Sequence, residues 1–133
     1  MRKNARESVF KILFSTVFNA ESDKDFRDFI YVDDKLNDVD VDFAEKLYQT
    51  IIDNEEVINA DISELSRGYS LDRIYSTDKC ALKIAICEMR YFNDVPNIVA
   101  ISEAMELVRK YSTAESPNFV NGILAEFKKR LEK

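Results

Sequence analysis

Apolar residues recur every three to four positions along most of the chain, which is the spacing that places them on one face of an α-helix. This pattern predicts a first helix over residues 4–19 and a short second helix over residues 24–31. A longer helical stretch is predicted over residues 41–67, with a break near Asp53-Asn54. The first half of the chain is therefore expected to be almost entirely helical.

The second half repeats this spacing and carries residues that are typical of helix starts. Ser76-Thr77-Asp78 is expected to cap a helix that runs to about Phe92, and Val95-Pro96 is expected to open the next one. Ser116-Pro117 opens the last helix: serine can accept a first-turn N–H there, and proline lacks the N–H that would be left unpaired. Six to seven helices are expected in all.

The chain contains only two glycines and two prolines, too few turn formers for an all-β or α/β fold. An all-α fold is therefore predicted. Gly68 is expected to end the long helical stretch, because glycine enters the left-handed conformation without steric cost. Gly122 lies inside the last helix, where it costs about 1 kcal/mol relative to alanine. This position predicts that another helix or a ligand approaches the backbone closely.

Phe10, Phe14 and Phe18 form a row at four-residue spacing that does not coincide with the main apolar stripe of the first helix. Two interpretations are open. The row belongs to a helix that is buried on two sides, or it is an exposed aromatic surface that docks a protein partner.

The net charge of −6 is unevenly distributed. Residues 1–20 carry a net charge of +3, residues 21–64 of −11 and residues 65–133 of +2. The ends of the chain can therefore meet a phosphate backbone although the average charge opposes it, because salt screens surface charges beyond about 8–10 Å. The acidic segment is interpreted as a solvated face, since it contains no calcium-binding loop pattern.

The composition argues against several functional classes. The chain has no histidine, no glycine-rich phosphate loop and no recognisable nucleophile with its partners, so no catalytic residues, cofactor or metal site are predicted. Cys80 and Cys87 are expected to be reduced core residues. No apolar run is long enough for a membrane span and no signal-peptide pattern is present, so a cytoplasmic location is expected.

Two features point toward RNA. The N-terminus holds Arg2, Lys3 and Arg6, and a turn near residue 115 presents Glu115, Asn118 and Phe119. An aromatic ring among polar groups is a suitable surface for unpaired bases, and basic residues can pair with phosphates. If the two segments meet in space, the cations bind phosphates while Phe119 stacks on a base.

Several segments resemble the NusB family of transcription antitermination factors. They are Asp94-Val-Pro96, Ile101-Ser-Glu-Ala104, Glu106-Leu107, Phe119-Val-Asn-Gly122, Ser70-Leu-Asp-Arg-Ile74, Asp78-Lys-Cys-Ala-Leu-Lys-Ile-Ala85 and Ala5-Arg-Glu7. The resemblance covers nearly the whole chain, although residues 20–60 match mainly in helical pattern. It implies a single NusB-like domain made of two small helical bundles, about residues 1–68 and 69–133.

The resemblance also implies a function. Members of the family bind the boxA element of nascent RNA together with NusE, a small ribosomal subunit protein, within the antitermination complex of RNA polymerase, and they catalyse no reaction. Carried over by position, the expected RNA-binding residues are Arg2, Lys3, Arg6, Glu115, Asn118 and Phe119. The expected NusE contacts are Phe14 and Asp78.

This sequence departs from the family pattern at four positions. Asn4 interrupts a usually denser arginine run, Ser112 replaces a common glycine, Pro117 replaces a basic or polar residue, and Ile98 stands where lysine is frequent. These changes remove positive charge near the expected RNA surface, so weak RNA affinity is expected without NusE. An acidic helical module for protein interaction or dimerisation, without RNA binding, is the alternative. A more remote alternative is the NusB-like domain of an RNA cytosine methyltransferase.

Overall fold

The computed structural model describes residues 2–17, 22–66 and 70–132. Within these ranges the chain forms α-helices and one short 3₁₀ turn, η1, but no strand, so the prediction of an all-α fold is confirmed. The elements are α1 (Arg2–Ser15), α2 (Lys24–Asp33), α3 (Asp38–Asp53), α4 (Glu55–Leu65), η1 (Leu71–Arg73), α5 (Ser76–Tyr91), α6 (Asn97–Tyr111) and α7 (Ser116–Leu131).

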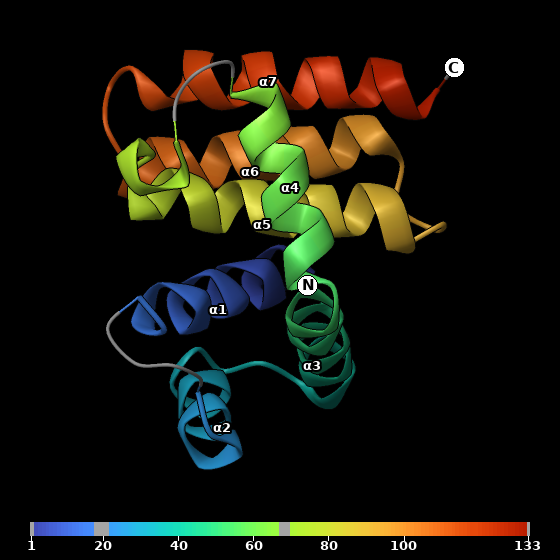
Figure 1. Cartoon of the computed structure of the whole chain (residues 1–133). Helices are drawn as coiled ribbons and strands as arrows, with labels where there is room; N and C mark the ends of the chain where they lie inside the picture. Colours follow the sequence, from blue (N-terminus) through green and yellow to red (C-terminus); the bar gives the residue numbers. More distant parts are fainter. Residues whose placement is uncertain (1, 18–21, 67–69, 133) are drawn as a thin grey trace.

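Helix α5 occupies the centre of the fold. It packs with α6 and α7 in one layer, and α4 crosses this layer against α5 and α7 (Figure 1). On the other side of α5 lies α1, which also packs along α3, while α2 lies beyond α1. The N-terminal helix is therefore held between elements from both expected halves of the chain.

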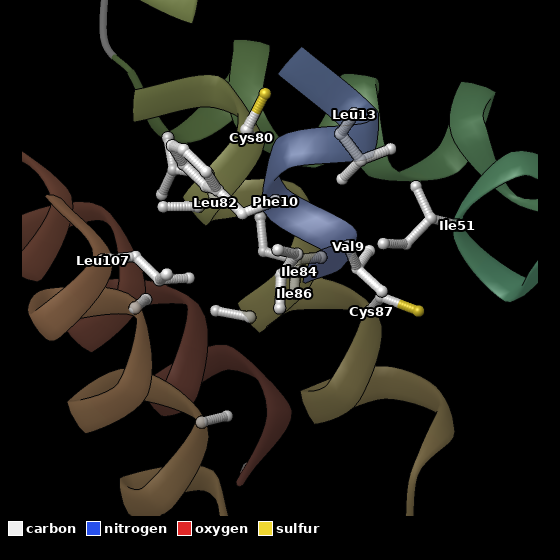
Figure 2. Close-up of a cluster of buried hydrophobic side chains, with 14 of the residues drawn as sticks. Val9, Phe10, Leu13, Ile51, Cys80, Leu82, Ile84, Ile86, Cys87 and Leu107 are labelled. Atoms are coloured by element: carbon white, nitrogen blue, oxygen red, sulfur yellow. The ribbon is translucent and has the colours of Figure 1, made fainter. Parts of the chain in front are cut away.

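The buried side chains form one continuous core. Val9, Phe10 and Leu13 of α1 meet the apolar face of α5, which includes Ile84 and Ile86 (Figure 2). Ile51 joins from α3 and Leu107 from α6. Because the core draws on residues before and after position 68, burial of this apolar surface stabilises the two expected halves together.

The helix boundaries agree with the sequence pattern in some places and not in others. The expected break at Asp53-Asn54 is confirmed, because α3 ends at Asp53 and α4 begins at Glu55. The first helix is shorter than predicted, since Thr16 and Val17 form a turn. Phe18 and the expected cap Gly68 lie outside the described residues.

Helices α5 and α7 begin at the predicted residues, Ser76 and Ser116, with Pro117 in the first turn of α7, but the predicted side-chain caps are wrong. Neither helix has a side-chain hydrogen bond at its N-cap, which is Tyr75 for α5 and Glu115 for α7. The Asp78 carboxylate accepts instead from the Ser116 hydroxyl at the start of α7. The Ser116 hydroxyl also accepts from the N–H of Thr113, a residue that precedes α7. Tertiary hydrogen bonds replace the local ones expected from the sequence.

Gly122 is not packed against another helix. Among the described residues no heavy atom beyond its own helical neighbours lies within 4 Å of the place where a Cβ would stand. The prediction of close helix packing is therefore wrong, and the open side of α7 at Gly122 is one turn from Phe119.

Cys80 and Cys87 are buried free thiols on α5, as expected. Burial raises the pKa of Cys80 to about 11 and that of Cys87 to about 12. No helix in the described ranges has both the length and the apolar character needed to cross a membrane.

Candidate nucleic-acid interface

The first two cations of α1 are engaged by carboxylates. Arg2 donates to Asp94 at 2.9 Å, and its guanidinium carbon lies 4.3 Å from the centroid of the Phe43 ring. The hydrogen bond from Arg2 holds the pKa of Asp94 below its usual value. Lys3 pairs with Glu106 of α6, and this contact raises the pKa of Lys3. Both pairs are exposed, so a phosphate can compete for either cation.

Arg6 is in a different environment. It is 5% exposed, and its Nε and Nη2 donate to both carboxylate oxygens of the fully buried Glu88, at 2.7 to 3.0 Å. Glu103 of α6 lies 3.7 Å from Nη1. Arg6 thus joins α1 to α5 and α6, and its hydrogen-bonding groups face the protein interior rather than solvent.

The next residue, Glu7, joins α1 to the end of α6. Lys110 Nζ and the Tyr111 hydroxyl both donate to Glu7 Oε2, and the Tyr111 ring stacks on Phe10 with 4.9 Å between centroids. Burial alone would raise the pKa of Glu7, but the two hydrogen bonds outweigh it and leave the pKa below its usual value. The C-terminus of α6, where the turn begins, is therefore fixed to α1.

The turn between α6 and α7 is organised around Asp78. This carboxylate is 2% exposed and accepts from the hydroxyl of Ser112 at 2.6 Å and that of Ser116 at 3.0 Å. The Thr77 and Thr113 hydroxyls extend the network. Ser112 supplies one of these bonds. Asp78 therefore holds the turn and does not present its carboxylate to a partner.

Two hollows are lined by residues near the C-terminus of α6 or in the turn that follows it. The first lies between α1 and α6 and is lined by Lys3, Arg6 and Lys110, among others. The second lies between the starts of α5 and α7 and is lined by Thr113, Glu115 and Phe119, among others. Lys110 and Thr113 are three positions apart, so the hollows are neighbours along the chain.

The structure thus brings the two expected segments near each other without merging them. Glu88, which binds Arg6, and Asp78, beside the Phe119 hollow, are ten positions apart on α5, or about 15 Å at 1.5 Å per residue. Asn118 is exposed on α7 beside the half-buried Phe119. Arg6 lines the hollow between α1 and α6, and Phe119 lines the hollow between the starts of α5 and α7.

Two cations that the sequence analysis did not select also line these hollows. Arg109 lines the first and Arg73 the second, and both are exposed. Within the described part of the chain, neither has a carboxylate within ion-pair distance. The adjacent Arg109-Lys110 pair just before the turn is a signal that could have identified Arg109; Arg73 has no such local signal.

The phenylalanine row of α1 is divided between core and surface. Phe10 is 3% exposed and belongs to the core, whereas Phe14 is 37% exposed. Leu13 and Val17, on either side of Phe14, line a further hollow between α1, α4 and the start of α5. Burial describes Phe10 and an exposed aromatic surface describes Phe14, so neither interpretation of the row holds for both residues.

Comparison with known proteins identifies related sequences over nearly the full length. Residues 3–129 match the family model described as the NusB family. The transcription antitermination protein NusB of Clostridium botulinum (strain Kyoto / Type A2) is 32% identical over 141 residues, covering 94% of this chain and 97% of the relative. The corresponding protein of Agathobacter rectalis is 34% identical over 128 residues, covering 95% and 98%.

Solved structures show the same fold. T. maritima NusB superposes with a TM-score of 0.86 at 29% identity, covering all of this chain and 98% of the other. A crystal structure of the antitermination factors NusB and NusE in complex with dsRNA gives a TM-score of 0.87 at 24% identity, covering 97% and 96%. At that identity the second likeness shows the fold alone.

Proposed function

The chain belongs to the NusB family, and on this premise we propose that it is a transcription antitermination factor that binds boxA-type RNA together with NusE. The proposal treats residues 1–133 as one NusB-like unit with helical halves at about 1–68 and 69–133. It assigns the protein a binding role rather than a catalytic one. Its setting is the antitermination complex of RNA polymerase.

The observation that carries the proposal is the pair of neighbouring hollows at the C-terminus of α6. One offers the cations Lys3 and Arg109, and the other offers the ring of Phe119 beside Glu115. Cationic groups that bind phosphates, next to an aromatic ring that stacks a base, are the features of single-strand binding surfaces. The structural neighbour solved with NusE is a complex with double-stranded RNA.

The six proposed RNA residues have different roles in this arrangement. Arg2 and Lys3 contact phosphates after exchanging their carboxylate partners, and Asn118, Glu115 and Phe119 contact a base. Arg6 acts as a positioning residue, because its guanidinium is committed to Glu88.

The two proposed NusE residues also differ. Phe14 is exposed and offers its ring to the partner, since aromatic residues are enriched at interface cores. Asp78 is buried and acts through the turn that it holds with Ser112 and Ser116. NusE binding is therefore expected to depend directly on Phe14 and indirectly on Asp78.

The test is a titration of labelled boxA RNA with the protein, with and without NusE, at low and moderate salt. The proposal predicts weak binding by the protein alone and tighter binding with NusE. Each phosphate contact should contribute about −0.7 to the slope of log K against log salt for a single strand. Absence of any NusE-dependent binding would remove the RNA function.

A second candidate function is supported by exposed apolar residues in the acidic segment. Phe29 and Val32 of α2 are 64% and 77% exposed, and Val39 at the start of α3 is 76% exposed. Exposed apolar groups rimmed by charge are typical of interaction surfaces. The alternative is a protein-interaction or dimerisation module, and it predicts self-association that Phe29→Asp abolishes in sedimentation experiments.

A further inference from the structure

The hollow between the starts of α5 and α7 contains more binding groups than the proposed function uses. Its volume is about 320 Å³, which is at the small end of the range for ligand sites. Besides Glu115 and Phe119, its lining includes Arg73 of η1 and Tyr75, the N-cap residue of α5. We call this the α5–α7 hollow.

Two aromatic rings line this hollow. Phe119 is half-buried in the first turns of α7, and Tyr75 is 62% exposed. The Tyr75 hydroxyl forms no hydrogen bond with any described residue, and its side chain makes no cap for α5. A tyrosine so exposed is not explained by packing. The rings of Tyr75 and Phe119 line the same hollow, and an exposed aromatic face is suited to stacking a base.

The charged groups of the hollow are of both signs and differ in availability. Arg73 is exposed and unpaired with any described carboxylate, in contrast to Arg2, Lys3 and Arg6. A guanidinium free of internal partners is well suited to a phosphate. Glu115 is exposed at the start of α7, and an ionised carboxylate only accepts hydrogen bonds.

The floor of the hollow is fixed. Asp78 and Ser116 both line it, and the Ser112 and Ser116 hydroxyls occupy the Asp78 carboxylate. These bonds join the first turn of α5 to the turn before α7, and so fix the start of α5, where Tyr75 is the N-cap residue, relative to the start of α7, which carries Phe119. A preorganised site of this kind binds with a smaller loss of conformational freedom.

We propose that the α5–α7 hollow binds one unpaired nucleobase that carries an exocyclic amino group, namely adenine, guanine or cytosine. The base lies against the rings of Tyr75 and Phe119, its amino group donates to Glu115, and Arg73 contacts an adjoining phosphate. Uracil is disfavoured, because its carbonyl oxygens would face the carboxylate where the other bases present a donor. This inference rests on the proposed RNA function and adds Tyr75, Arg73 and a base preference to it.

The experiment measures boxA RNA binding in the presence of NusE for the wild type, Tyr75→Ala and Tyr75→Phe. A parallel RNA series carries one abasic nucleotide at each position in turn. Tyr75→Ala should raise Kd about ten-fold, within the range known for loss of one base stack, whereas Tyr75→Phe should stay near the wild type. For one abasic position only, Tyr75→Ala should cause no further loss, which identifies the base in the hollow.

Two more variants test the charged groups. Arg73→Gln should lower the magnitude of the salt slope by about 0.7, and Lys129→Gln, an exposed lysine at the far end of α7, is the matched control. At the identified position, wild-type protein should bind an RNA with adenine, guanine or cytosine more tightly than one with uracil, and Glu115→Gln should reduce this difference.

The outcomes separate this inference from the proposed function. If the wild type with NusE binds no boxA RNA, both fail. If the wild type binds RNA but Tyr75→Ala has the wild-type Kd for boxA RNA and for every RNA of the abasic series, the nucleobase site is refuted while the RNA function stands. If Tyr75→Ala weakens NusE binding in the absence of RNA and leaves RNA binding unchanged, the hollow is a protein contact and the inference is overturned.

Discussion

Arg6 and Glu88, 82 positions apart in the sequence, form a bidentate ion pair that is almost completely shielded from solvent. The pair joins the basic N-terminus of α1 to the central helix. A residue that the sequence places among the RNA contacts is therefore a structural element of the fold, and this distinction leads to the first prediction.

Glu88→Ala should lower the free energy of unfolding by about 3–5 kcal/mol, because it removes the bidentate partner of the buried Arg6 and leaves only Glu103, 3.7 Å from Nη1. Urea unfolding measures this loss. The double variant Arg6→Met with Glu88→Leu should recover most of it, since both members of the buried pair are replaced by apolar side chains. A small loss in Glu88→Ala would show that Arg6 is free to reach solvent, and hence RNA.

Glu106→Gln should strengthen RNA binding, because Lys3 no longer has a carboxylate to exchange for a phosphate. The expected gain is at most about five-fold, corresponding to the upper value of ~1 kcal/mol for an exposed ion pair. Glu64→Gln removes the exposed partner of Arg130 between α4 and α7 and is the matched control. Equal effects of the two variants would mean that only total charge matters.

Phe14→Asp should weaken NusE binding while changing stability by no more than about 0.5 kcal/mol, as expected of a surface position. Phe10→Ala, one turn earlier on the same helix, should instead cost about 3–5 kcal/mol of folding free energy through the cavity it leaves. Calorimetry of NusE binding and thermal unfolding measure the two effects. A large stability loss in Phe14→Asp would assign that ring to the core.

Gly122→Ala should stabilise the protein by about 1 kcal/mol, because alanine has the higher helix propensity and the position is open. RNA binding by the same variant tests the remaining explanation for this glycine. Weaker RNA binding with higher stability would indicate that the ligand approaches the α7 backbone. Unchanged RNA binding would leave Gly122 without a binding role.

Glu7→Gln should destabilise the protein at neutral pH and less so in acid. The pKa of Glu7 is lowered in the folded state, so its stabilising contribution is complete above the ordinary value of 4.5 and is lost as the pH falls through the lower folded pKa. Urea unfolding of the wild type and the variant at pH 7 and pH 3 should therefore show a difference that shrinks in acid. The same difference at both values would contradict the role of the Lys110 and Tyr111 contacts.

The local pattern of the sequence was sufficient for the elements of this fold. Helical spacing and the scarcity of glycine and proline predicted the all-α class and the break after Asp53. These features depend on interactions between residues a few positions apart, and such interactions form within a single helix. The ordered family segments likewise led to the family that the comparisons show.

Tertiary structure alone decided which polar groups are available. Arg2, Lys3 and Arg6 are similar in sequence, but their partners lie about 80 to 100 positions away, and only Arg6 meets a buried one. Asp78 and Ser116 have the sequence signature of caps, yet they bond to each other. Burial and pairing are set by contacts between distant segments, and no local pattern encodes them.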